Sequence, residues 1–161
     1  MGDVQFQVDQ SMFLLRVAAL AWHDGRILLH RSLPDGFWAL PGGRVNLGED
    51  VMSAIVREVF EESGFTVTAH RLTWVIENFW TGPKWPNPDP VACHEIGFYI
   101  EVEPSPNMCR LNSFDGIEGG QSLEFRWFDL SEVAMLDLRP AILKTNLTAT
   151  SGPVLHLVTR D

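Results

Sequence analysis

The first half of the chain shows two patterns of apolar and polar residues, and the first pattern is typical of β-strands. Residues 12–15 and 17–22 are unbroken apolar runs, and together they predict a buried or half-buried strand. An Asp-Gly pair at residues 24 and 25 follows, and residues 26–31 place Ile27 and Leu29 on one face of a second strand. We therefore expect a β-hairpin here.

The second rhythm is helical and covers residues 49–63. Apolar side chains recur there at intervals of three and four residues, which is the spacing of one face of an α-helix. Gly64 follows at the position where a helix favours a residue that adopts a positive φ angle, so the helix should end there. The predicted core-facing stripe consists of Met52, Ile55, Val56, Val59, Phe60 and Ser63.

The rest of the chain predicts more strands than helices. Residues 81–90 contain four prolines and predict a loop, and residues 104–121 predict a long irregular connection. Ser131 and Pro140 are expected near the starts of two short helices. Strands around a central helix indicate an α/β domain of the layered, α+β kind. Further strands are predicted at residues 66–80, 94–103, 123–129 and 154–159.

Composition and charge narrow the function. A chain of 161 residues suits one domain, which we expect to span residues 1–161, and its formal charge of −9 disfavours duplex nucleic acid and anionic membrane surfaces. The apolar runs are far shorter than the roughly 20 residues that span a bilayer. Two cysteines form no disulfide framework, and the first residues resemble no secretory signal. A cytoplasmic location is expected.

Three glutamates in the predicted helix carry the main candidate chemistry. Glu58, Glu61 and Glu62 stand at i, i+3 and i+4, so their carboxylates should gather on one helix surface that flanks the apolar stripe. At ~6 Å and an effective dielectric constant of ~20, each pair would repel by about 3 kcal/mol. A hard cation such as Mg²⁺ or Mn²⁺ would relieve that repulsion. The alternative is a solvated acidic face.

The residues around these glutamates resemble a complete Nudix box. The spacing is a glycine, five residues, a glutamate, seven residues, Arg-Glu-Val, one residue, Glu-Glu, one residue, Gly-Phe. A match at every fixed position over 23 residues makes chance an unlikely explanation, and the resemblance to the Nudix hydrolase family extends more loosely to the whole chain. The matched positions are Gly43, Glu49, Arg57, Glu58, Val59, Glu61, Glu62, Gly64 and Phe65.

The resemblance implies a fold and a metal site. The fold would be a mixed β-sheet sandwiched between helices, with the box as a loop–helix–loop. The activity would be hydrolysis of a nucleoside diphosphate linked to another moiety, with Mg²⁺ or Mn²⁺ as cofactor. Carried over by position, Glu58 and Glu62 would be the principal metal ligands, and Glu61 a further ligand or a water-activating carboxylate. The carbonyl of Gly42 would complete the inner shell.

The same resemblance implies supporting roles. Glu49 and Arg57 would pair and tie the entry loop to the helix. A general base often lies outside the box in this family, and Glu118 and Glu124 are the candidates here, with Glu61 as the third possibility. Glu118 belongs to a glycine-rich stretch that could close over a substrate.

Substrate contacts are the most open part of the prediction. Arg44 and Arg31 could meet phosphate oxygens through planar guanidinium groups, and Trp80 or Trp85 could stack on a base. The alternative for each tryptophan is core or loop packing. The expected ligand is a small nucleotide diphosphate derivative, and a homodimer is possible.

Two other functions are compatible with the same fold. One is a non-catalytic nucleotide-sensing domain, although such sensors usually have eroded boxes and an attached DNA-binding domain. The other is a prenyl diphosphate isomerase, for which the sequence offers no positive sign. Phosphate release from a nucleotide panel would separate hydrolysis from both.

Overall fold

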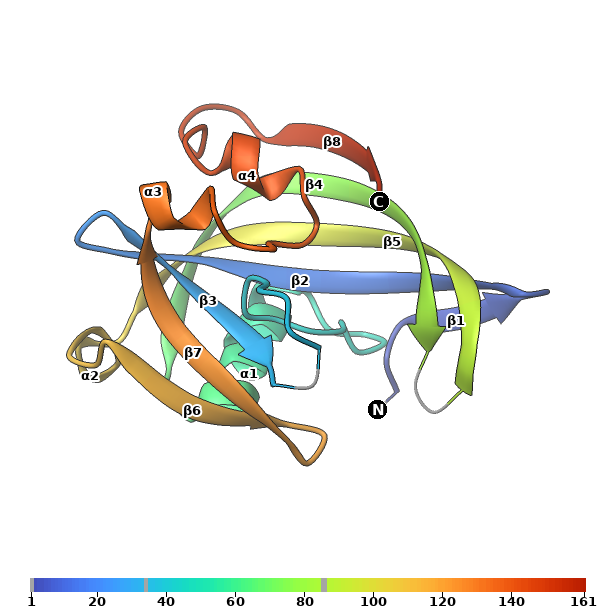
Figure 1. The fold of residues 1–161 in the computed structure, drawn as a ribbon, viewed down its shortest axis with the longest axis horizontal. Coiled ribbons are helices and arrows are strands. Elements are labelled where there is room, and N and C mark those ends of the chain that lie inside the picture. The colour runs from blue at the N-terminus through green and yellow to red at the C-terminus, as the bar shows by residue number, and fades with distance from the viewer. Residues whose placement is uncertain (1, 34, 85–86) are drawn as a thin grey trace.

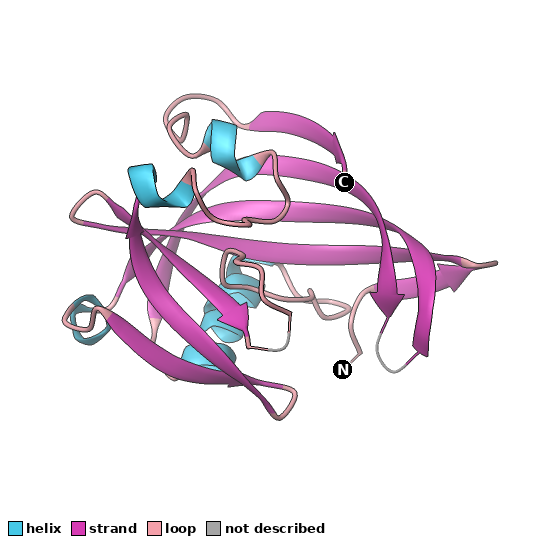
Figure 2. Cartoon of the chain, viewed as in Figure 1, coloured by secondary structure: helices cyan, strands magenta, loops and turns pink. Residues whose placement is uncertain are grey.

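The strands form one mixed sheet that splits into two parts (Figures 1 and 2). The computed structural model describes residues 2–33, 35–84 and 87–161. The strands are β1 (Gln5–Val8), β2 (Ser11–His23), β3 (Arg26–Ser32), β4 (Val67–Lys84), β5 (Asn87–Pro104), β6 (Ser113–Glu118), β7 (Gln121–Asp129) and β8 (Leu155–Arg160). The helices are α1 (Val51–Ser63), α2 (Pro106–Cys109), α3 (Leu130–Val133) and α4 (Leu143–Asn146). The described helices are all too short or too polar to cross a bilayer.

The strand order is β6-β7-β3-β2-β5-β4-β8, and β1 pairs with β2. The β2–β5 and β4–β8 pairs are parallel and the other pairs are antiparallel. The predicted hairpin is confirmed, with positive φ angles of 48° at Asp24 and 75° at Gly25, as a two-residue hairpin turn requires. In the β2–β3 ladder, Trp22 pairs with Ile27 and His23 pairs with Arg26, and beyond these pairs the two strands diverge.

Helix α1 fills the space that this divergence opens. Its buried Ile55 and Val59 pack against Val17 of β2 on one side and Phe125 of β7 on the other. In Figure 1 the helix lies below β2, with β6 and β7 on its other side. The opposite face of the β2–β5–β4 sheet packs under α3 and α4, where Trp74 is fully buried. This arrangement confirms the predicted mixed sheet with helices on both sides.

The buried face of α1 differs from the predicted stripe. Phe60 is 53% exposed and Glu62 is only 2% exposed, although Phe60 was expected in the core and Glu62 beside it. The helix lies between two sheets, so its buried sector turns toward the loop and β6 as well as toward β2. The helix also begins two residues later than predicted, because Asp50 accepts hydrogen bonds from the backbone of Met52 and Ser53 as its N-cap. It ends at Gly64 as predicted, with a φ angle of 74°.

Two predicted loops are wrong. Residues 81–84 continue β4 and residues 87–90 begin β5, with Pro83 opposite Pro90. Pairing of β2 with β5 starts only at Ala92, so these prolines lie in a two-stranded end of the sheet where a missing N–H group costs few ladder bonds.

The second wrong loop covers residues 104–121, which contain α2 and β6. Gly119 and Gly120 have φ angles of 54° and 85° and close a β6–β7 hairpin that the Gly-Gly pair could have indicated. Near the C-terminus, Asp129 rather than Ser131 caps α3, and α4 begins three residues after Pro140.

The loop before α1 depends on a glycine at position 42. Gly42 has a φ angle of 144°, and a Cβ atom there would lie 2.2 Å from the backbone oxygen of Val17. Gly42→Ala should therefore lower the free energy of unfolding by about 2–3 kcal/mol through overpacking and backbone strain. Urea unfolding at neutral pH measures this.

Gly48→Ala is the matched control, because Gly48 also has a positive φ angle, of 85°, but open space around it. It should cost about 1 kcal/mol. Equal losses in the two variants would show that the loop does not press against β2 as described.

Candidate active site

The loop that leads into α1 is held against β2 by backbone hydrogen bonds. The amide of Val17 donates to the carbonyl of Gly43 at 2.9 Å, and that of Ala19 donates to Pro41 at 2.7 Å. A Cβ atom on Gly43 would lie 2.3 Å from Oε2 of Glu58. Only glycine at position 43 therefore lets this carboxylate approach the loop.

Arg57 fastens the same loop to the helix. Its Nε and Nη2 donate to the two carboxylate oxygens of Glu49 at 2.8 Å each, and Nη2 also donates to the carbonyl of Arg44 at 2.9 Å. Oε2 of Glu49 accepts a further hydrogen bond from the amide of Asn46 at 3.0 Å. These bonds to the ionised carboxylate hold the pKa of Glu49 below its ordinary value. The predicted Glu49–Arg57 pair is thus present.

Arg57 also contacts two of the three helix glutamates. Its Nη1 donates to Glu58 at 2.8 Å and to Glu61 at 3.0 Å. The side chain of Glu58 is 14% exposed and that of Glu61 is 56% exposed. Burial raises the pKa of Glu58 even though Arg57 opposes the shift. The glutamates are therefore not a group of purely repelling carboxylates, as the spacing predicted, because a guanidinium lies between two of them.

Glu62 is the most buried of the three. Its Oε2 accepts a hydrogen bond from the amide of Gly42 at 3.1 Å, whereas its Oε1 is buried without a partner. Burial raises the pKa of Glu62 well above its ordinary value, and the negative charge of Glu118 adds to the shift. His30 Nδ1 lies 3.8 Å from Oε2, but burial and the charge of Arg16 lower the pKa of His30 to about 3. A neutral imidazole makes this contact a polar one and not an ion pair.

The three carboxylates do not converge on a single point. Glu58 and Glu61 turn onto Arg57 and Glu62 turns onto Gly42, and the described part of the chain holds no group of three Asp, Glu, His or Cys side chains placed to hold an ion. The donor chemistry nevertheless fits a hard cation. All donors are oxygens, and the buried, unpartnered Oε1 of Glu62 lacks the hydrogen bond that such atoms normally have.

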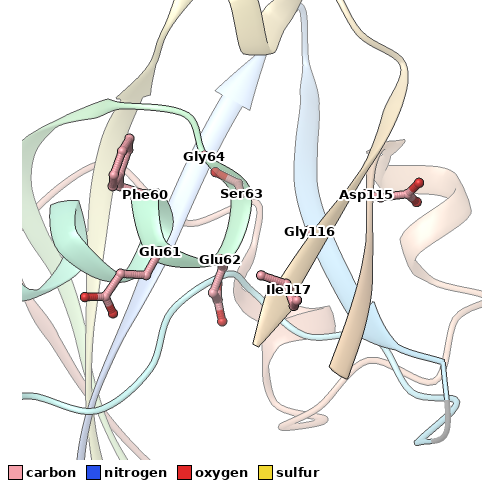
Figure 3. A pocket seen from close by; sticks show the side chains of 8 residues that line it. All are labelled: Phe60, Glu61, Glu62, Ser63, Gly64, Asp115, Gly116 and Ile117. Atoms are coloured by element: carbon pink, nitrogen blue, oxygen red, sulfur yellow. The ribbon is translucent and has the colours of Figure 1, made fainter. Parts of the chain in front are cut away.

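A hollow of about 450 Å³ lies between the end of α1 and β6. Figure 3 shows Glu61 and Glu62 extending from the helix, with Ile117 facing them from β6 and Asp115 pointing away. A Cβ atom on Gly116 would lie 2.2 Å from the carbonyl oxygen of Glu62, so β6 passes directly against the helix. The lining residues are Phe60, Glu61, Glu62, Ser63, Gly64, Asp115, Gly116 and Ile117.

The two candidate bases outside the box differ in their surroundings. Glu118 is exposed at the end of β6, and its charge reaches Glu62. Glu124 on β7 pairs with Arg31, whose Nη2 lies 2.7 Å from Oε2. The Arg31 guanidinium also lies over the ring of Trp38 at 4.6 Å. Arg31 and Glu124 therefore form an ion pair with each other.

The other predicted substrate contacts are Arg44, Trp80 and Trp85, and the structure describes the first two, whose side chains do not lie beside the glutamates. The Arg44 side chain is 3.4 Å from Asp3 at the N-terminal end of the chain, so only its backbone joins the Arg57 network. Trp80 packs against a small apolar cluster formed by Met12, Leu14 and Cys93. Trp85 lies outside the described residues.

Sequence reasoning missed three residues of this region. Gly116 and His30 contact or approach Glu62 from β6 and β3, and no local motif marks them. Arg16 donates from Nη2 to the carbonyl of Gly42 at 3.1 Å. Its signal was visible, because it is the single charged residue in the apolar stretch 12–22.

Comparisons with known proteins identify the family of the chain. The model of the NUDIX domain matches residues 12–148, which include the loop, α1 and the β6–β7 hairpin. The chain belongs to the NUDIX domain family. Nudix hydrolases generally use divalent metal ions.

The curated relatives match this chain over about a third of its length. A stretch of 55 residues is 44% identical to a MutT-like protein of Streptomyces ambofaciens and covers 34% of this chain and 36% of that protein. A stretch of 62 residues is 36% identical to an RNA pyrophosphohydrolase of Haemophilus ducreyi and covers 38% of this chain and 31% of that protein. The matched stretches span about a third of the length of these relatives.

Solved structures match over most of the chain. An ADP-ribose pyrophosphatase from Streptococcus suis is 18% identical with a TM-score of 0.61, covering 91% of this chain and 98% of its own. A NUDIX hydrolase from Nitrosomonas europaea is 20% identical with a TM-score of 0.65, covering 92% of this chain and 79% of its own. At these identities the likeness shows a shared fold.

The Glu49–Arg57 pair should make stability depend on pH. The pKa of Glu49 is lower in the folded chain than its ordinary value of 4.5, so its stabilisation is complete above pH 4.5 and is lost as the pH falls through the lower, folded value. Glu49→Gln should lower the free energy of unfolding by about 1.5–3 kcal/mol at pH 7, and the difference from wild type should shrink below pH 4.5. Urea unfolding at a series of pH values measures this.

Glu103→Gln is the control, because the Glu103 side chain is 70% exposed and lies outside the network. It should leave the free energy of unfolding at pH 7 within about 0.5 kcal/mol of wild type. A Glu49→Gln deficit that stays constant down to pH 3 would contradict the ionised pair.

Proposed function

We propose that this chain is a divalent-metal-dependent pyrophosphohydrolase that cleaves a nucleoside diphosphate linked to another moiety. The observation that carries the proposal is Glu62, a buried carboxylate with one unpartnered oxygen, held beside the Gly42–Gly43 loop. Glu58 lies against the same loop, and the Arg57–Glu49 pair keeps the loop in place. Membership of the NUDIX family supports the reaction class.

Each group of the site has a proposed role. Glu58, Glu62 and the carbonyl of Gly42 would hold Mg²⁺ or Mn²⁺, and Glu61 would be a further ligand or would activate water. When bound, the ion supplies positive charge against the diphosphate and lowers the pKa of a water molecule. Glu49 acts only through Arg57, by keeping the loop and helix in register.

Glu118 is the preferred general base. It is exposed at the tip of the β6–β7 hairpin, and it is close enough for its charge to raise the pKa of Glu62. Glu124 is less favoured, because its Oε2 is already paired with Arg31 at 2.7 Å. Glu61 is the third candidate, because its side chain is exposed at the edge of the hollow.

The substrate class is a small nucleotide derivative. Its phosphates would lie over the helix glutamates, and the hollow beside Phe60 and Ile117 offers apolar surface next to them. Arg31, Arg44 and an aromatic side chain such as Trp80 remain proposed contacts, and the first two would have to release Glu124 and Asp3. The formal charge of −9 disfavours long polyanionic substrates, and we propose a cytoplasmic location.

Hydrolysis should depend on Glu58 and Glu62, the two less exposed glutamates of α1. With Mg²⁺ present, wild type should convert at least one member of a panel of nucleotide sugars, dinucleotides, nucleoside triphosphates and 5′-triphosphate RNA, with products identified by mass. Glu58→Gln combined with Glu62→Gln should lower turnover by at least ~1,000-fold, because the charge that holds the metal is lost. Far-UV circular dichroism should stay unchanged.

Metal binding provides the control for that result. Mn²⁺ should raise the melting temperature of wild type in a concentration-dependent way and leave the double variant unshifted. Glu132→Gln is the matched surface variant, and it should keep both turnover and the Mn²⁺ shift. Near-wild-type turnover in the double variant would show that these carboxylates do not hold the metal. Ligand binding without any turnover would favour the nucleotide-sensing alternative, and an isomerised isoprenoid product would favour the prenyl diphosphate isomerase.

The two candidate bases can be separated by single substitutions. Glu118→Gln should lower kcat by about 100- to 10,000-fold, which is the range for loss of a general base, and leave KM nearly unchanged. Glu124→Gln should change kcat by less than about tenfold, because its carboxylate serves Arg31. Steady-state kinetics on the substrate found in the panel measure both, and the reverse order of effects would assign the base to Glu124.

A further inference from the structure

A guanidinium group enters the site from a strand that is otherwise apolar. Arg16 lies on β2 between two unbroken apolar runs, and it is half-buried. Taking a charged group out of water is costly unless partners replace its hydration. Core packing therefore does not explain why a charged side chain stands at this position.

The partners present in the structure do not satisfy this group. Arg16 makes one side-chain hydrogen bond, from Nη2 to the carbonyl of Gly42 at 3.1 Å, although a guanidinium has five N–H donors. Within residues 2–33, 35–84 and 87–161 it forms no ion pair with a carboxylate. Most of its donors are free to meet a ligand.

Negative groups surround Arg16 at longer range. The negative charges of Glu95, Glu62 and Glu118 act on it and favour its charged form. A guanidinium group stays protonated at neutral pH, so Arg16 carries a positive charge. Arg16 and Glu62 also share a backbone partner, because Gly42 donates its amide to Glu62 and accepts from Arg16 through its carbonyl.

Taken with the site described above, these contacts place a fixed positive charge at the border of the proposed metal site. The positive charge of Arg16 would repel a second cation. An anion held between the metal and the guanidinium would be attracted from two sides. The approach of β2 to the loop before α1 is visible in Figure 1.

We propose that Arg16 binds the substrate, by donating hydrogen bonds to non-bridging oxygens of its diphosphate. This proposal rests on the proposed pyrophosphohydrolase function and adds a phosphate contact that the Nudix box does not contain. Arg31 and Arg44 already have carboxylate partners at 2.7 Å and 3.4 Å, whereas among the described residues the side chain of Arg16 bonds only to the Gly42 carbonyl, beside the glutamates.

The test compares anion binding with metal binding in the same variants. Arg16→Gln removes the charge but retains an amide that can donate to the carbonyl of Gly42, and Arg16→Lys retains the charge without the planar fork. Isothermal titration would measure the dissociation constant of imidodiphosphate, a diphosphate that resists hydrolysis, at saturating Mg²⁺. The same variants would be titrated with Mn²⁺ alone.

Arg16→Gln should weaken imidodiphosphate binding by at least about tenfold, and Arg16→Lys should weaken it less. Neither variant should bind Mn²⁺ more than about threefold more weakly than wild type, because Arg16 donates to the diphosphate and is not a ligand of the ion. KM for the panel substrate should rise with the imidodiphosphate constant. Arg110→Gln is the matched control, since Arg110 is exposed and its side chain donates to Asn107 at 3.4 Å, and it should change none of these values.

The contradicting results are distinct. Unchanged imidodiphosphate binding in Arg16→Gln would overturn the proposal while leaving the hydrolase function intact. A parallel loss of Mn²⁺ affinity would also overturn it, because Arg16 would then only position Gly42. If Arg16→Gln fails to fold, the Arg16→Lys titrations decide between the same outcomes. Failure of wild type to hydrolyse any panel member would instead count against the proposed function.

Discussion

The site depends on one guanidinium group that joins a loop to a helix. Arg57 reaches from α1 to both oxygens of Glu49 and to the carbonyl of Arg44, and so fixes the loop that carries Gly42 and Gly43. Backbone bonds from Val17 and Ala19 hold the loop against β2, and Arg57 adds the ion pair that holds it to α1. A bidentate guanidinium–carboxylate pair is suited to this task, because its two parallel bonds fix an orientation as well as a distance.

The tie makes it possible to bury negative charge. Glu62 is almost completely buried and Glu58 largely so, and burial raises the pKa of both. Positive charge approaches from two directions, with Arg57 on the side of Glu58 and Arg16 on the side of Gly42. This distribution suits the proposed binding of a divalent ion together with a diphosphate, since each needs charge of the opposite sign within a few ångströms.

Local patterns predicted the central helix and most strands but missed β6 and the paired ends of β4 and β5, and contacts between distant segments were beyond them. The Asp24-Gly25 hairpin and the end of α1 at Gly64 follow from turn and capping chemistry, and the Nudix box follows from spacing. Periodicity failed at Phe60 and Glu62, because it assumes one buried face and α1 lies between two sheets. The pairing of Arg31 with Glu124 joins residues 93 positions apart, and only the fold brings them together.

The central claim is that the carboxylates of α1 and the Gly42 loop form a metal site, and a crystal structure of the chain grown with Mn²⁺ tests it most directly. Anomalous diffraction should place an ion among Glu58, Glu62 and the carbonyl oxygen of Gly42, with Glu58 turned away from Arg57 and the Glu49–Arg57 pair intact. The account would be contradicted if no ion is found there while Glu58 still contacts Arg57, or if Mn²⁺ is bound only elsewhere.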